Sequence, residues 1–103
     1  PLVVLVGADW CPHCQVMKQS TMPQLAQRGV LGKVAFAEVN SDREGPLARE
    51  LMNGGPIPQL IMYHKTADGW QRSLLVGSRS AGEIESFLQQ GLAAPTSQQL
   101  GAR

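Results

Sequence analysis

The chain has only two cysteines, Cys11 and Cys14, and they follow closely on an unbroken apolar run at residues 2–6. The residues after Cys11 are typical of a helix. A strand that leads into a helix with C-x-x-C at the junction is the sequence context of a redox-active dithiol. This pair constrains the fold more than any other feature, because it fixes where one strand ends and one helix begins.

A helix start at Cys11 favours its thiolate. Pro12 suits the first helical position, where its missing N–H is not needed. A sulfur there faces unpaired backbone N–H groups and the positive end of the helix dipole. Cys14 lies about one turn deeper on the same face, so we expect only Cys11 to reach solvent easily. We therefore predict that Cys11 is the attacking nucleophile and that Cys14 resolves the mixed disulfide.

Three other roles for the pair remain open. A structural disulfide across so short a loop would stabilise the fold by only about 2 kcal/mol. A zinc or iron–sulfur site needs about four ligands, and His13 and His64 are the only histidines beside the single cysteine pair. Another chain would have to complete such a site. Two free buried thiols fit poorly with a proline and a histidine between them.

Composition indicates one globular domain without strong charge. The chain has 103 residues, 43% of them apolar, and a formal net charge of +1. This balance favours neither nucleic acid nor an anionic membrane surface as a partner. No apolar run reaches the length of a membrane span, so we expect no membrane contact by this domain. We also expect the domain to be a monomer. The start at Pro1, directly on a core strand, suggests a processed or trimmed chain.

The pattern of apolar residues and turn signals predicts four strands and four helices. We expect strands at residues 2–6, 33–40, 60–63 and 70–76. We expect helices at residues 11–19, 23–28, 45–53 and 80–92, with a break and restart at residues 20–23 where Ser20 or Thr21 caps the second helix. Ser80 and Glu83 have the spacing of a capping box.

This order predicts an α/β fold with a four-stranded mixed sheet between helices. The first two strands, joined by a helix, should be parallel, and the last two should form an antiparallel hairpin. We expect one domain over residues 1–92 and a flexible tail over residues 93–103.

The motifs resemble those of the thioredoxin superfamily. The run from Trp10 to Cys14 is similar to its W-C-x-x-C, Ile57-Pro58 to its Ile-cis-Pro, and Gly77 with the capped helix to its closing segment. The resemblance implies the thioredoxin fold and a thiol–disulfide oxidoreductase, with Pro58 cis and packed against the two sulfurs. It also implies that Trp10, Ile57 and Pro58 form an apolar platform, where the Ile57 backbone pairs with an extended substrate chain.

The dipeptide between the cysteines is similar to that of the DsbA family of periplasmic disulfide oxidases. By this resemblance Pro12 and His13 set the redox potential: His13 would stabilise the Cys11 thiolate and make the disulfide more oxidising. The alternative is an exposed His13 with a small effect. The large helical insertion of that family is missing, since only a short helix separates Asn40 from Pro58.

One residue of the thioredoxin pattern is replaced. The buried aspartate of the family falls on Leu5, so the usual proton acceptor for Cys14 is missing. Glu38 is the candidate replacement, because it shares a strand face with Val34 and Phe36. If it is buried, desolvation should raise its pKa and suit it for proton exchange with Cys14. The alternative is a solvated glutamate near the end of the strand.

The sequence therefore predicts a thiol–disulfide oxidoreductase that acts on cysteines of other proteins and is recharged by an upstream redox partner. It should need no cofactor, because the dithiol itself carries the electrons. The dipeptide and the lack of other cysteines favour an extracytoplasmic compartment. Two alternatives stay open: a copper- or zinc-binding module with the same fold, and a redox-sensing domain of a longer chain.

Overall fold

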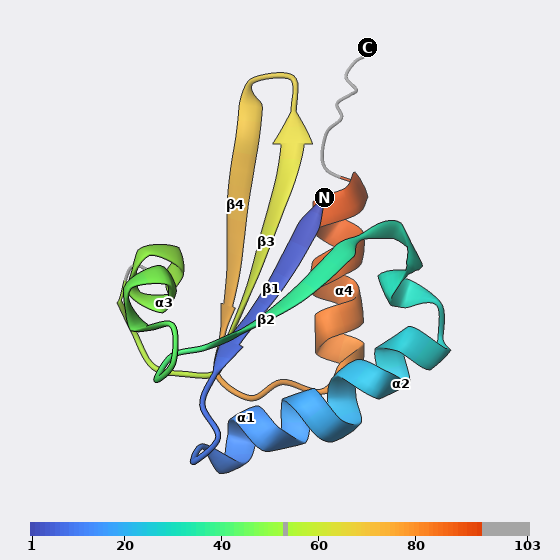
Figure 1. Cartoon of the computed structure of the whole chain (residues 1–103). Coiled ribbons are helices and arrows are strands. Elements are labelled where there is room, and N and C mark those ends of the chain that lie inside the picture. The colour runs from blue at the N-terminus through green and yellow to red at the C-terminus, as the bar shows by residue number, and fades with distance from the viewer. Residues whose placement is uncertain (53, 94–103) are drawn as a thin grey trace.

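The computed structural model describes residues 1–52 and 54–93 and shows a mixed β-sheet with helices on both faces (Figure 1). Its strands are β1 (Leu2–Gly7), β2 (Ala35–Asn40), β3 (Gln59–Thr66) and β4 (Gly69–Val76), in the spatial order β2-β1-β3-β4. β1 pairs parallel with β2, whereas β1–β3 and β3–β4 are antiparallel. The predicted four-stranded mixed sheet is confirmed.

The helices form two unequal layers. One layer holds α1 (Pro12–Val16), the π-helix η1 (Met17–Thr21), α2 (Met22–Gln27) and α4 (Ala81–Ala93). The opposite face carries α3 (Gly45–Met52) (Figure 1). Within the described residues, no helix is both long and apolar enough to span a membrane.

β1 is buried on both faces because its side chains alternate between two cores. Val3 and Leu5 belong to the larger core, on the side of α2 and α4. Val4 and Val6 belong to the smaller core, on the side of α3. The continuous apolar run thus places β1 in the centre of the sheet, as predicted, and Cys11 at the junction that follows it.

The predicted break between two helices at residues 20–23 is wrong. Thr21 and Met22 both have helical backbone angles, and Thr21 makes no side-chain cap. The chain instead widens into the π-helix η1, where the Met22 N–H bonds to the Met17 carbonyl. Pro23 lacks an N–H and would crowd a regular α-helical turn, so the wider turn lets the helix continue through it.

The other boundaries lie close to their predicted positions. β2 begins at Ala35 because residues 30–33 form the 3₁₀-helix η2 (Val30–Lys33). α3 ends at Met52, shortly before Gly54 and Gly55, which both have positive φ angles. The predicted tail lies, from residue 94 onward, outside the described residues.

The capping box of α4 is confirmed. The Ser80 N–H donates to Glu83 Oε1 at 3.1 Å, and the Glu83 N–H donates to Ser80 Oγ at 3.2 Å. These bonds satisfy backbone groups that the first turn of a helix leaves free. Ile84 and Leu88 then point into the larger core and are fully buried.

Candidate active site

The cysteine pair lies where β1 gives way to α1. Cys11 is the N-cap of α1, with an extended backbone, and its Sγ accepts a hydrogen bond from the Cys14 N–H at 3.2 Å. Pro12 holds the first helical position. Cys11 and Cys14 form a disulfide, with Cα atoms 5.2 Å apart. The Cys11 sulfur therefore faces the free N–H groups of the first turn, as the sequence predicted.

The expectation that Cys11 is much more exposed than Cys14 is wrong. In the disulfide state both residues are buried, with 5% and 4% of their surface exposed. The two cysteines differ in the residues that pack against them. A Cβ at Gly7 would lie 2.9 Å from Cys14 Cβ and 3.0 Å from its Sγ. Cys14 is thus pressed against the backbone of β1, while Cys11 sits at the outer end of the helix.

Ile57 and Pro58 approach the cysteines from the start of β3. The peptide bond between them is cis. Ile57 is half-buried and packs against the cluster of Ala8, Cys11 and Cys14. Pro58 is fully buried, and its carbonyl accepts a hydrogen bond from the Gly77 N–H at 2.8 Å. Of these two residues, Ile57 is the one that offers surface beside the disulfide.

Trp10 stands on the outer side of the site. It is 68% exposed, and its indole Nε1 donates to Asp42 Oδ2 at 2.8 Å. The neighbouring Asp9 forms a 2.7 Å ion pair with Arg43. The segment before Cys11 is thereby tied twice to the loop between β2 and α3.

A third tie comes from the backbone. The Ser41 N–H donates to the Gly7 carbonyl at 2.8 Å. Asn40 shapes the loop that carries these contacts, because its Oδ1 accepts from the N–H groups of Asp42 and Arg43 at 2.9 and 3.1 Å. Such Asx turns are the common role of asparagine at the end of a strand.

His13 is exposed on the first turn of α1. Among the described residues, no hydrogen bond holds its imidazole. It lies two residues after Cys11, on a turn whose Cys14 N–H bonds the Cys11 sulfur.

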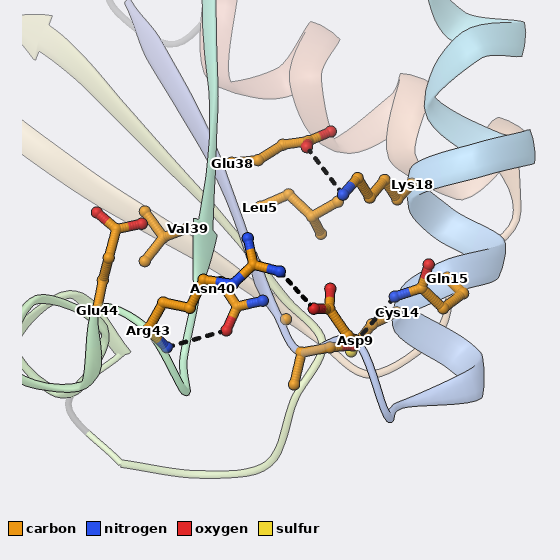
Figure 2. Close-up of a pocket in the computed structure, with 12 residues that line it drawn as sticks. Leu5, Asp9, Cys14, Gln15, Lys18, Glu38, Val39, Asn40, Arg43 and Glu44 are labelled. Carbon is orange, nitrogen blue, oxygen red and sulfur yellow. Dashed lines mark hydrogen bonds and ion pairs between the residues drawn. The ribbon is translucent and has the colours of Figure 1, made fainter.

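A pocket of about 220 Å³ lies on the β2 side of Cys14. Figure 2 shows the side chains that line it. Leu5, Cys14, Lys18 and Glu38 are among the residues that line it. Glu38 forms a 3.8 Å ion pair with Lys18, and its side chain is 40% exposed. The burial of Glu38 that the sequence analysis considered is therefore not found, although the residue does share a pocket with Cys14.

The sequence matches the thioredoxin family over residues 1–90. The chain belongs to the thioredoxin family. Among solved structures it is similar to the thioredoxin of Trichomonas vaginalis, with 24% identity and a TM-score of 0.70 over 86% of this chain and 77% of that one. A thioredoxin from Thermus thermophilus gives 22% identity and a TM-score of 0.71 over 99% and 84%. A search of curated proteins gave no significant match.

These similarities confirm the thioredoxin fold. Mitochondrial thioredoxin 3 of Saccharomyces cerevisiae, in its oxidised form, gives 20% identity and a TM-score of 0.70 over 86% of this chain and 76% of that one. Thioredoxin-family membership and a Cys11–Cys14 pair at disulfide distance support thiol–disulfide oxidoreductase activity in general.

Sequence reasoning missed several contacts of this thioredoxin-family site. The close packing at Gly7 could have been predicted, because a glycine in a strand often marks a close approach of another chain segment. Asn40 also carried a local signal, since it ends a strand and precedes Ser-Asp. The ion pair of Asp9 with Arg43 joins segments far apart in sequence, and nothing local indicates it.

The described residues also bear on the alternative of a metal site. Within residues 1–52 and 54–93, no three His, Cys, Asp or Glu side chains are grouped so that they could share a metal ion. The two cysteines and His13 are neighbours in sequence, but the disulfide occupies both sulfurs in this structure.

Proposed function

We propose that this domain exchanges disulfides with cysteines of other proteins, with Cys11 as the nucleophile and Cys14 as the resolving residue. The observation that carries the proposal is the place of the Cys11 sulfur at the N-cap of α1, where it accepts the Cys14 N–H. A charged sulfur accepts that bond more strongly than a neutral one, so the helix start stabilises the thiolate.

The exchange proceeds in two balanced steps. The Cys11 thiolate attacks one sulfur of a substrate disulfide, a mixed disulfide forms, and the other substrate sulfur leaves as a thiolate. Cys14 then loses its proton and attacks Cys11 Sγ. This step forms the Cys11–Cys14 disulfide and releases the second substrate thiolate. Two electrons pass from the domain to the substrate, and the reverse sequence oxidises a substrate dithiol.

Substrate binding falls to Ile57, with Trp10 at the outer margin of the site. Ile57 contacts the cysteine cluster and precedes β3, so an extended peptide laid beside it would bring its sulfur to Cys11. Pro58 supports this surface from below. We propose no cofactor, because the dithiol carries the electrons itself, and an upstream redox partner that returns Cys11 and Cys14 to their starting state.

We further propose that Pro12 and His13 give the pair a more oxidising potential than that of a reducing thioredoxin, as their resemblance to the DsbA dipeptide suggests. A group that stabilises the Cys11 thiolate stabilises the reduced form and makes the disulfide a stronger oxidant. Such a potential suits an extracytoplasmic compartment, where disulfides persist. We propose that the domain acts there as a monomer.

Trapping of the mixed disulfide tests the proposed chemistry. Cys14→Ser removes the resolving sulfur, so a disulfide-bonded protein such as insulin should stay covalently attached to Cys11. Cys11→Ser is the matched control and should trap nothing. Mass spectrometry of non-reduced samples gives the result. Equal trapping by both variants, or trapping only through Cys14, would contradict the assigned roles.

The redox potential tests the finer proposal. Equilibration of the native domain with a glutathione buffer should place the Cys11–Cys14 pair closer to the strong oxidants, about −120 mV, than to reducing thioredoxins, about −270 mV. A potential at the reducing end would mean that the surrounding fold outweighs Pro12 and His13, and that the domain acts as a reductase.

A further inference from the structure

We infer that Gln59 is a positioning residue, which holds Ile57 against the disulfide so that protein substrates can be aligned there. The inference deepens the proposed function and rests on it. Gln59 follows Pro58 in the chain and contacts neither sulfur, so it would act only through the loop that carries Ile57.

Gln59 closes this loop at its base. Its side-chain Nε2 donates to the Gly54 carbonyl at 2.9 Å. Its backbone lies in the central strand β3, opposite Val6 of β1 and Val76 of β4. The Gln59 side chain therefore links Gly54, at the start of the segment 54–59, to β3, where the segment ends. Ile57 lies within the fastened segment.

The surroundings of the Gln59 amide are shaped to receive it. Gln59 is 1% exposed. A Cβ at Gly55 would lie 2.8 Å from Gln59 Nε2, and Gly55 has a φ of +89°. Any larger residue at position 55 would push the amide away from Gly54 and would also strain the backbone. On the other side of the loop, the Gly77 N–H holds the Pro58 carbonyl at 2.8 Å.

The second atom of the same amide shows that stability is a poor explanation for this glutamine. Gln59 Oε1 is buried without a hydrogen-bond partner among the described residues. A buried acceptor left unpaired costs free energy, which offsets the gain from the single bond to Gly54. An apolar residue of similar length would remove this cost. A glutamine here is therefore better explained by the geometry that its Nε2 imposes on the loop.

Protein and small-molecule substrates should depend differently on this geometry. A protein substrate needs both the Cys11 sulfur and the surface at Ile57, whereas a small aromatic disulfide needs only the sulfur. Loosening the loop should therefore weaken the first reaction and spare the second. A residue that merely supported the dithiol would affect both reactions alike.

The experiment compares two variants that open the same contact from opposite sides. Gln59→Met removes the bond to Gly54, and Gly55→Ala displaces the amide. Gly29→Ala is the control for Gly55→Ala, because Gly29 also has a positive φ, of +77°, but an added Cβ there would have no neighbouring atom within 4 Å. Reduced proteins are assayed against insulin and against a small aromatic disulfide, and urea unfolding is measured for each.

We expect both loop variants to lose about tenfold in the second-order rate constant for single-turnover reduction of insulin, which corresponds to one lost hydrogen bond. Their rates with the small disulfide should stay within about twofold of the native rate. Gln59→Met should unfold at the same urea concentration as the native domain or a higher one, and Gly29→Ala should keep the native ratio of the two rates.

Two results would overturn the inference: unchanged insulin kinetics in both loop variants, or an equal loss with both substrates. If one variant fails to fold, the other decides, since each opens the contact alone. Failure of the proposed function looks different, because the native domain itself would then not reduce insulin.

Discussion

At the scale of single residues, the two cysteines differ by what surrounds their sulfurs. The Cys14 N–H bonds to Cys11 Sγ, whereas Cys14 itself lies against Gly7 without space for a methyl group. A thiolate attacks a disulfide along the line of the S–S bond, so the sulfur that it attacks must be open on its far side. The packing of Cys14 on β1 blocks this approach to Cys14 Sγ. The packing thus supports the proposed division of labour between nucleophile and resolving residue, even though both residues are buried to a similar degree.

His13 is the residue whose change tests the tuning of this site most directly. If His13 stabilises the Cys11 thiolate as proposed, His13→Ala should make the reduced form less stable. We expect the potential to become more negative by about 30 mV, which is a tenfold change in the equilibrium constant. Equilibration with glutathione gives the value. Val16→Ala, at a site 53% exposed on the same helix, is the control and should leave the potential unchanged.

Glu38 offers a test of proton transfer at Cys14. If Glu38 accepts the Cys14 proton through the shared pocket, Glu38→Gln should slow the resolving step by about a hundredfold or more and alter its pH dependence. Stopped-flow measurement of the second step over a range of pH gives the profile. Lys18→Met is the matched control, because it removes the ion-pair partner and keeps the carboxylate. A pH profile of Glu38→Gln that overlays the native one would remove Glu38 from the mechanism.

At the scale of elements, local signals predicted the start of α4 correctly. They did not predict that the helix continues through residues 20–23. The capping box at Ser80 acts within one turn of chain, so its residues alone determine it. The passage through Pro23 depends instead on the packing of Met17, Met22 and Leu25 into the larger core, which holds the widened turn in place. That packing comes from strands distant in sequence, so the signals at Ser20 and Thr21 were misleading.

The start of α4 carries a pH dependence that can be measured. The Ser80 backbone N–H, followed by the Ser80 hydroxyl, lowers the pKa of Glu83 from its ordinary value of 4.5. The folded state therefore holds this proton less tightly than the unfolded state. The stabilisation is complete above the ordinary value and is lost as the pH falls through the lowered one.

Glu83→Gln should accordingly be less stable than the native domain at neutral pH, and the two should converge in acid. Urea unfolding at several pH values gives the comparison. Glu50→Gln, at an exposed site in α3, is the control for the loss of one negative charge. A difference between Glu83→Gln and the native domain that persists unchanged in acid would contradict the assignment.

At the scale of the whole molecule, the sheet separates a larger core from a smaller one, and the site lies at the edge of both. The sequence was sufficient for the central place of β1, its parallel pairing with β2 and the antiparallel hairpin of β3 and β4, but the spatial order β2-β1-β3-β4 comes from the structure. It was also sufficient for the cysteine pair, and the family resemblance indicated Ile57, which packs beside that pair. It could not provide the loop contacts of Asp42 and Arg43, because these depend on how two loops meet after folding.

The larger core should dominate the stability of the domain. Leu60→Ala removes a fully buried side chain from the centre of the sheet and should destabilise the fold by about 2–5 kcal/mol. Leu47→Ala, at a site on α3 that is 44% exposed, should change stability by no more than about 0.5 kcal/mol. Urea unfolding followed by circular dichroism gives both values. Comparable effects at the two sites would contradict this distribution of the core.

The three ties between the segment before Cys11 and the loop after β2 bear on how the active site could be transplanted. Gly7, Asp9 and Trp10 are joined in turn to Ser41, Arg43 and Asp42. A graft of Cys-Pro-His-Cys alone onto another scaffold would carry the dipeptide but would omit the contacts with Ser41, Asp42 and Arg43 that hold the preceding segment. A portable form of this site therefore needs residues 40–43 together with residues 7–14, beside the loop that brings Ile57 to the cysteines, and a designer would have to move these stretches together.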